Sequence, residues 1–122
     1  MHRYSIRALV LVLAVATGFA AAPTPAQAAV VVKAVSTSSG YRWHPASVSV
    51  GKGAKVVWKN PTTVTHTVTA YTKNWSKKVT IKKGQSTSFT FKNAGTYKYY
   101  CTIHGQLVNG VCSGMCGKVV VG

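Results

Sequence analysis

The sequence has 122 residues and contains neither aspartate nor glutamate. Without carboxylate side chains, the chain cannot form the acid pair of a glycoside hydrolase, a Ser-His-Asp triad or an acidic cage for Mg²⁺ or Ca²⁺. Its 15 Lys and Arg residues give a formal charge of +15. A surface of this charge attracts anions and predicts an acidic partner protein or an anionic cell envelope. Nucleic acid is not expected, because the lysines are spread along the chain without a nucleic-acid-binding motif.

Long apolar runs are also absent, except near the start of the chain. Ala8–Ala22 is almost wholly apolar, follows two arginines and leads to Ala26 and Ala28, small residues at the spacing that a signal peptidase accepts. The apolar run is short for a helix that crosses a membrane. We therefore predict a secretory signal over residues 1–28 and one exported domain over residues 29–122, located in the periplasm or outside the cell.

Helical periodicity is missing from residues 29–122, where no 12-residue stretch carries an apolar stripe. Short β-branched or alternating runs are instead separated by Gly, Pro and Asn turns, which is typical of strands. The expected strands cover residues 30–35, 47–50, 55–59, 65–70, 79–81, 86–92, 96–101 and 117–121. Seven or eight short strands predict an all-β fold, a Greek-key sandwich or barrel.

Cysteine is scarce, and its number is odd. Cys101, Cys112 and Cys116 all lie near the end of the chain. An odd number in an exported protein predicts one disulfide and one thiol with another role. The count alone leaves all three pairings open.

Potential metal ligands are concentrated near these cysteines. Cys101 and His104 form a C-x-x-H motif, His66 precedes it by 35 residues, and Met115 follows it. A thiolate and two neutral imidazoles in a plane, with a long, weak thioether bond, suit copper in both of its common oxidation states. These residue types therefore predict a copper site.

Four segments, in order, resemble plastocyanin-like cupredoxins. Ser47–Asn60 resembles their entry strands, Thr65–Val68 their first histidine site, Gly95–His104 their cysteine strand and Gly114–Val121 their methionine loop with the last strand. The resemblance extends over nearly all of residues 29–122. It implies a monomeric blue copper protein that is not an enzyme and carries single electrons between redox partners through one type 1 copper ion.

The resemblance also implies roles for individual residues. The expected metal ligands are His66, Cys101, His104 and Met115. His104 is expected near the surface, where its edge passes the electron. Asn60 and Thr67 are expected to brace the segments that carry the first histidine and the cysteine.

One segment departs from the family pattern. Ten residues, Gly105–Gly114, separate the second histidine from Met115, whereas the family has a short loop here. We expect a longer loop, closed by a disulfide between Cys112 and Cys116 that fixes the direction of the methionine. Because the departure affects the axial position, the amide oxygen of Gln106 is an alternative ligand there.

Three other functions remain compatible with the sequence. The first is copper delivery, using extra sulfurs from Cys112, Met115 and Cys116. The second is a structural zinc site, made of Cys101, His104, Cys112 and Cys116. The third is a metal-free basic sandwich that adheres to anionic surfaces, which explains the charge but not the placement of cysteine and histidine.

Overall fold

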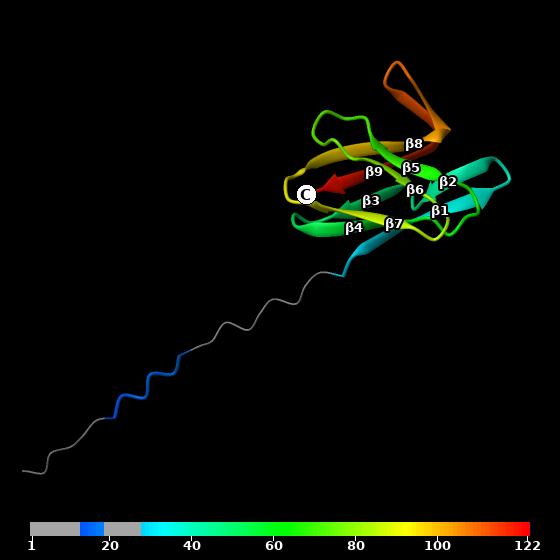
Figure 1. The fold of residues 1–122 in the computed structure, drawn as a ribbon. Coiled ribbons are helices and arrows are strands. Elements are labelled where there is room, and N and C mark those ends of the chain that lie inside the picture. The colour runs from blue at the N-terminus through cyan, green and yellow to red at the C-terminus, as the bar shows by residue number, and fades with distance from the viewer. Residues whose placement is uncertain (1–12, 19–27) are drawn as a thin grey trace, which may run out of the picture.

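The computed structural model describes residues 13–18 and 28–122, and its folded part begins at strand β1 (Figure 1). Residues 13–18 have no regular secondary structure. Most of the predicted signal, residues 1–28, lies outside the described residues and stays a prediction. Among the residues that are described, no helix is long and apolar enough to cross a membrane.

Nine strands lie in the described residues and form two sheets. The first sheet has the order β2 (Gly40–His44), β1 (Val30–Thr37), β4 (Ala54–Lys59) and β7 (Ser86–Phe91). The second has the order β3 (Ser47–Val50), β9 (Val111–Val121), β8 (Gly95–Val108), β5 (His66–Ala70) and β6 (Lys78–Ile81). The pairs β1–β4 and β3–β9 are parallel, and the other pairs are antiparallel. The all-β sandwich is confirmed, with β2 as a strand that the sequence did not predict.

Alternation along the strands separates a shared core from the two outer faces. In β4, Val56 and Trp58 are fully buried while Lys55 and Lys59 are exposed, the period of two that a half-buried strand requires. Aromatic side chains make up much of the core between the sheets: Trp43, Trp58, Trp75, Phe91, Tyr97 and Tyr99. This packed interior gives the site a rigid support.

The pair β8–β9 extends beyond the sandwich as a hairpin, which we call the arm and which comprises residues 105–114 (Figure 1). Its turn residues, Asn109 and Gly110, both have positive φ, at 48° and 76°. These are the conformations of a two-residue type I′ turn, which Asn-Gly strongly favours. The expectation of a loop over Gly105–Gly114 is therefore wrong, because this turn allows the segment to pair with itself.

β9 bends sharply where the arm leaves the sandwich. The Cα atoms of Cys112 and Cys116 are 6.1 Å apart, whereas four steps along an extended strand cover about 13 Å. Gly114 lies within the bend with φ of 79°, and a Cβ there would come within 2.6 Å of the His104 carbonyl oxygen. A disulfide between Cys112 and Cys116 closes the bend. Glycine and disulfide together define this corner.

Candidate metal centre

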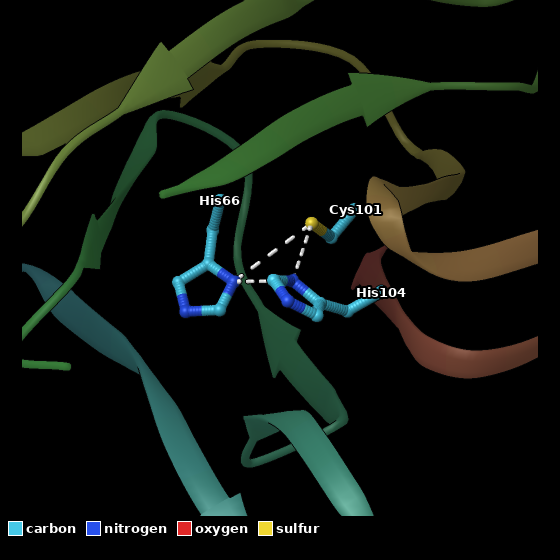
Figure 2. Close-up of side chains that lie close together, drawn as sticks. All are labelled: His66, Cys101 and His104. Atoms are coloured by element: carbon cyan, nitrogen blue, oxygen red, sulfur yellow. Dashed lines mark hydrogen bonds between the residues drawn. The ribbon is translucent and has the colours of Figure 1, made fainter. Parts of the chain in front are cut away.

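Three side chains from two adjacent strands converge at one end of the sandwich. His66 begins β5, and Cys101 and His104 lie in β8 where its register with β9 is interrupted. Figure 2 shows both imidazoles and the sulfur directed at one another. The two Nδ1 atoms are 3.1 Å apart, and the Cys101 Sγ lies 3.8 Å from Nδ1 of His66 and 3.7 Å from Nδ1 of His104.

The geometry of this cluster fits a metal ion. A point equidistant from the two nitrogens and the sulfur lies about 2 Å from each, similar to the roughly 2.0–2.3 Å of zinc–nitrogen and zinc–sulfur bonds. The donor set is two imidazoles and one thiol, which in a trigonal arrangement is the set that selects copper. Among the described residues, these three form the group of potential metal ligands whose ligand atoms lie close enough to one another to hold a metal.

Hydrogen bonds determine which nitrogen of His66 faces the cluster. The hydroxyl of Thr62 donates to Oδ1 of Asn60 at 2.6 Å and also lies 2.8 Å from Nε2 of His66. Because the hydroxyl proton is used by Asn60, Nε2–H of His66 is the donor to Thr62. The lone pair then lies on Nδ1, the atom that faces Cys101 and His104, as a metal ligand requires.

Asn60 has contacts that suit a bracing role. Its side-chain amide donates to the carbonyl oxygens of Val64 at 2.7 Å and Ile81 at 3.0 Å, and its Oδ1 accepts the backbone N–H of Thr62 at 3.0 Å. The residue is 1% exposed, so these bonds satisfy a polar group that is costly to bury alone. They hold the segment before His66 in place, in agreement with the expectation from the sequence.

Thr67 links the two ligand-bearing strands. Its backbone N–H donates to Sγ of Cys101 at 3.3 Å, and its hydroxyl accepts the backbone N–H of Thr102 at 2.9 Å. Cys101 is a fully buried free cysteine. The hydrogen bond from Thr67 fixes the direction of this buried sulfur toward the two imidazoles.

His104 differs from the other two residues in its exposure. It is half-buried, whereas His66 and Cys101 are fully buried. The Tyr41 ring packs edge-on against both imidazoles, with centroid distances of 5.0 Å to His66 and 4.7 Å to His104. The cluster is therefore closed on the protein side, and the edge of His104 is its route to the surface.

Met115 lies opposite the segment that carries the thiol and the second histidine. Tyr100 pairs with Cys116 and Gly105 pairs with Gly114, so the four residues between them on β8 face Met115 alone on β9. Met115 is fully buried and belongs to the same core cluster as Cys101. This position suits an axial ligand.

Gln106, the alternative axial residue, is placed differently. It is exposed and lies on the arm, where it pairs with Ser113. The position beyond the corner separates it from the buried cluster.

The expected disulfide between Cys112 and Cys116 is present, and Cys101 remains free. The zinc site made of four residues is therefore wrong, because two of its sulfurs are bonded to each other. Copper delivery through extra thiols fails for the same reason, since a disulfide does not offer thiolates to Cu(I).

The contacts that Thr62 and Tyr41 make with the cluster were not predicted from the sequence. Thr62 has a recognisable pattern, because Asn-Pro-Thr favours a turn in which the asparagine side chain accepts a backbone N–H two residues later. Tyr41 has none, since its strand was not predicted and its contacts are long-range.

Comparison with known proteins identifies the family of the chain. Residues 29–122 match the family described as copper binding proteins, plastocyanin/azurin family. A reduced Cu(I) form of an amicyanin mutant at pH 4 is 30% identical, with a TM-score of 0.62 over 80% of this chain and 85% of that one. A purple cupredoxin from Nitrosopumilus maritimus is 20% identical, with a TM-score of 0.60 over 76% and 99% of the two chains, and supports the fold alone.

The fold and the cluster define a small copper protein of the electron-transfer class. The chain belongs to the plastocyanin/azurin family, the cupredoxins. Its cofactor is copper, one ion, for which the described residues offer one cluster of two imidazoles and a thiol.

Proposed function

We propose that this protein is an exported carrier of single electrons, in which His66, Cys101 and His104 would hold one type 1 copper ion and Met115 would be the fourth ligand. The observation that carries the proposal is the convergence of two Nδ1 atoms and one sulfur within 3.8 Å of one another. Bound copper supplies the one-electron chemistry by alternating between Cu(I) and Cu(II).

The protein's part in this function is to keep the ligands still. His66 is held by Thr62, Cys101 is held by the backbone N–H of Thr67, and both imidazoles pack on Tyr41. Thr67 and Tyr41 lie in strands, and Thr62 lies in a segment that Asn60 holds through four hydrogen bonds, so the contacts leave little room for rearrangement. A site that does not rearrange accepts and releases an electron with a small reorganisation cost.

Burial also keeps the first imidazole available to the metal. Desolvation, together with the neighbouring His104, lowers the pKa of His66 from 6.5 to about 4. A metal binds only neutral imidazole, so protons compete less at this residue than at an exposed histidine. The half-buried His104 then offers the shortest route for an electron to an external partner.

The charge of the chain favours an acidic redox partner. Of the 15 Lys and Arg residues, 13 lie in residues 29–122, and no acidic side chain offsets them. Opposite charge on a partner would accelerate encounter and orient the complex. The same charge permits association with an anionic cell envelope.

Visible spectroscopy tests the proposal. Addition of Cu(II) to the purified protein should produce an intense thiolate-to-copper band, and Cys101→Ser should abolish it. The double variant Cys112→Ser/Cys116→Ser is the control, because it removes two sulfurs outside the cluster and should retain the band. Absence of the band in the unmodified protein would overturn the proposal.

A further inference from the structure

An open pocket of about 420 Å³ lies at the base of the arm and includes none of the four proposed copper ligands. Its lining includes Lys98, Lys118, Tyr71, Val111 and the disulfide between Cys112 and Cys116. The bend in β9 creates this pocket, because the disulfide joins the arm to the strand that carries Lys118. The pocket is thus a feature of this chain's inserted arm.

Two positive charges face each other in the pocket without a counter-charge. Lys98 on β8 and Lys118 on β9 are directly opposite in the antiparallel register, and both are exposed. Their neighbours Tyr97, Tyr99 and Val119 are buried, so the lysines lie on the outer face of the sheet. Like charges in this position destabilise a sheet, and the chain has no carboxylate side chain to relieve them. An anion between the two ammonium groups would stabilise both.

The adjoining surface is apolar. Four large hydrophobic residues of the folded part are exposed, and all lie in or beside the arm: Ile103, Leu107, Val108 and Val111, at 56%, 36%, 52% and 70%. Val108 and Val111 are directly opposite in the register of the arm and so share one of its faces, and exposed apolar groups that lie together mark interaction sites. Val111 also lines the pocket, so an apolar wall and a pair of cations meet there.

The pair of lysines and the apolar wall together indicate which kind of molecule binds in the pocket. A free inorganic anion would use the lysines but leave the apolar wall exposed. A second copy of this chain brings no acidic side chain and carries the same high positive charge. A protein segment with a carboxylate next to an apolar side chain satisfies both parts of the surface.

We propose that the pocket at the base of the arm docks an acidic segment of a partner protein, with a carboxylate between Lys98 and Lys118 and an apolar side chain against Val111. The inference rests on the proposed function, because the partner in question is the redox partner. It adds the place where that partner's acidic group binds and a reason for the inserted hairpin.

The probe for the test is a pentapeptide with a central leucine flanked by two glutamates on each side. It is titrated into the copper-loaded protein in the reduced, diamagnetic state, and amide chemical shifts are followed by NMR. We expect saturable shifts that centre on Lys98, Val111 and Lys118. The double variant Lys98→Gln/Lys118→Gln should weaken binding by at least about tenfold, because two charge-assisted contacts are lost.

The matched control is Lys55→Gln/Lys92→Gln, which removes the same charge from exposed positions, one on β4 and one directly after β7, two strands of the other sheet. It should change the affinity by less than about twofold, as expected for screened charges at a distance. Equal loss in both double variants, or shifts spread over all lysines, would show general charge attraction and overturn the proposal.

Two further measurements distinguish a peptide from an inorganic anion as the occupant, and the docking proposal from the proposed function. Val111→Ser should weaken the peptide but not inorganic phosphate, and phosphate that binds the pocket as tightly as the peptide would contradict a peptide occupant. The thiolate-to-copper band is recorded for every variant. A normal band without localised peptide binding rejects this inference alone, whereas absence of the band in the unmodified protein rejects the proposed electron carrier.

Discussion

The Nδ1 atom of His66 lies 3.1 Å from the Nδ1 atom of His104. The proton of His66 is committed to Thr62 through Nε2, so a lone pair of His66 is directed at the other imidazole. Two nitrogen atoms held this close need a cation or a shared proton between them. The fold therefore builds the electrostatic environment of a metal site from protein groups alone.

This environment predicts the acid sensitivity of the metal-free protein. The pKa of His66 is lowered from 6.5 to about 4 by burial, with a contribution from His104, the titratable group that it faces. Between pH 6.5 and about 4, His66 binds a proton in the unfolded chain but not in the native chain. The free energy of unfolding therefore falls as pH decreases through this range. The loss is about 3 kcal/mol for this shift.

Chemical denaturation of the metal-free protein across this pH range provides the measurement. No aspartate or glutamate contributes, so the histidines dominate the slope. His66→Gln should flatten the dependence, whereas His44→Gln, at an exposed position, should leave it unchanged. An unaltered slope in His66→Gln would contradict the assignment.

Replacement of the methionine tests the axial position. Met115→Leu should keep the visible band, because the thiolate and imidazoles remain, and should raise the reduction potential, because loss of a donor disfavours Cu(II). The expected change is on the order of 59 mV, a tenfold shift in preference for a one-electron couple. Voltammetry provides the value. Gln106→Leu is the control and should leave the potential unchanged; the reverse pattern would identify the glutamine as the ligand.

The disulfide at the corner should affect the copper site through geometry. Cys112→Ser/Cys116→Ser leaves the planar ligands intact but releases the bend that holds Met115. We expect a retained band, a broader or shifted copper EPR signal in the oxidised state, and a small loss of stability, below about 3 kcal/mol because the closed loop is short. An EPR spectrum identical to that of the unmodified protein would show that the core alone positions the methionine.

A glycine in β9 should be important for stability. A Cβ at Gly117 would overlap the ring of Tyr99, which is fully buried and cannot move aside. Gly117→Ala should therefore destabilise the fold by about 1–3 kcal/mol, measured by thermal or denaturant unfolding. Gly122→Ala, which has open space around its Cβ, is the matched control. Equal stability of the two variants would show that the Tyr99 packing can adjust.

The positive surface should control reactions with small redox reagents. Oxidation of the reduced copper protein by anionic hexacyanoferrate should slow as ionic strength increases, because salt screens the attraction. Oxidation by a cationic cobalt phenanthroline complex should accelerate under the same conditions. Stopped-flow rates provide the comparison, and the same salt dependence for both reagents would exclude electrostatic steering.

Local pattern predicted most strands and the proposed ligands, but not how the chain connects them in space. Period-two alternation located segments such as β4, and residue chemistry singled out Cys101 and His104. β2 was not predicted, because Gly40–His44 contains no β-branched residue and is followed by a proline. The arm was not predicted, because the length of Gly105–Gly114 indicated a loop, although Asn109-Gly110 is a strong hairpin pattern. The role of Tyr41 could not be predicted, because it depends on contacts between the two sheets.

A single strand of 14 residues, β8, passes from the core through Cys101 and His104 to the tip of the arm. A protein that binds the arm would thus contact the same strand that carries the buried sulfur of Cys101 a few residues away. We therefore expect binding of a partner to the arm to shift the geometry of the copper site. This shift should change the visible absorption spectrum of the copper-loaded protein before any electron is transferred.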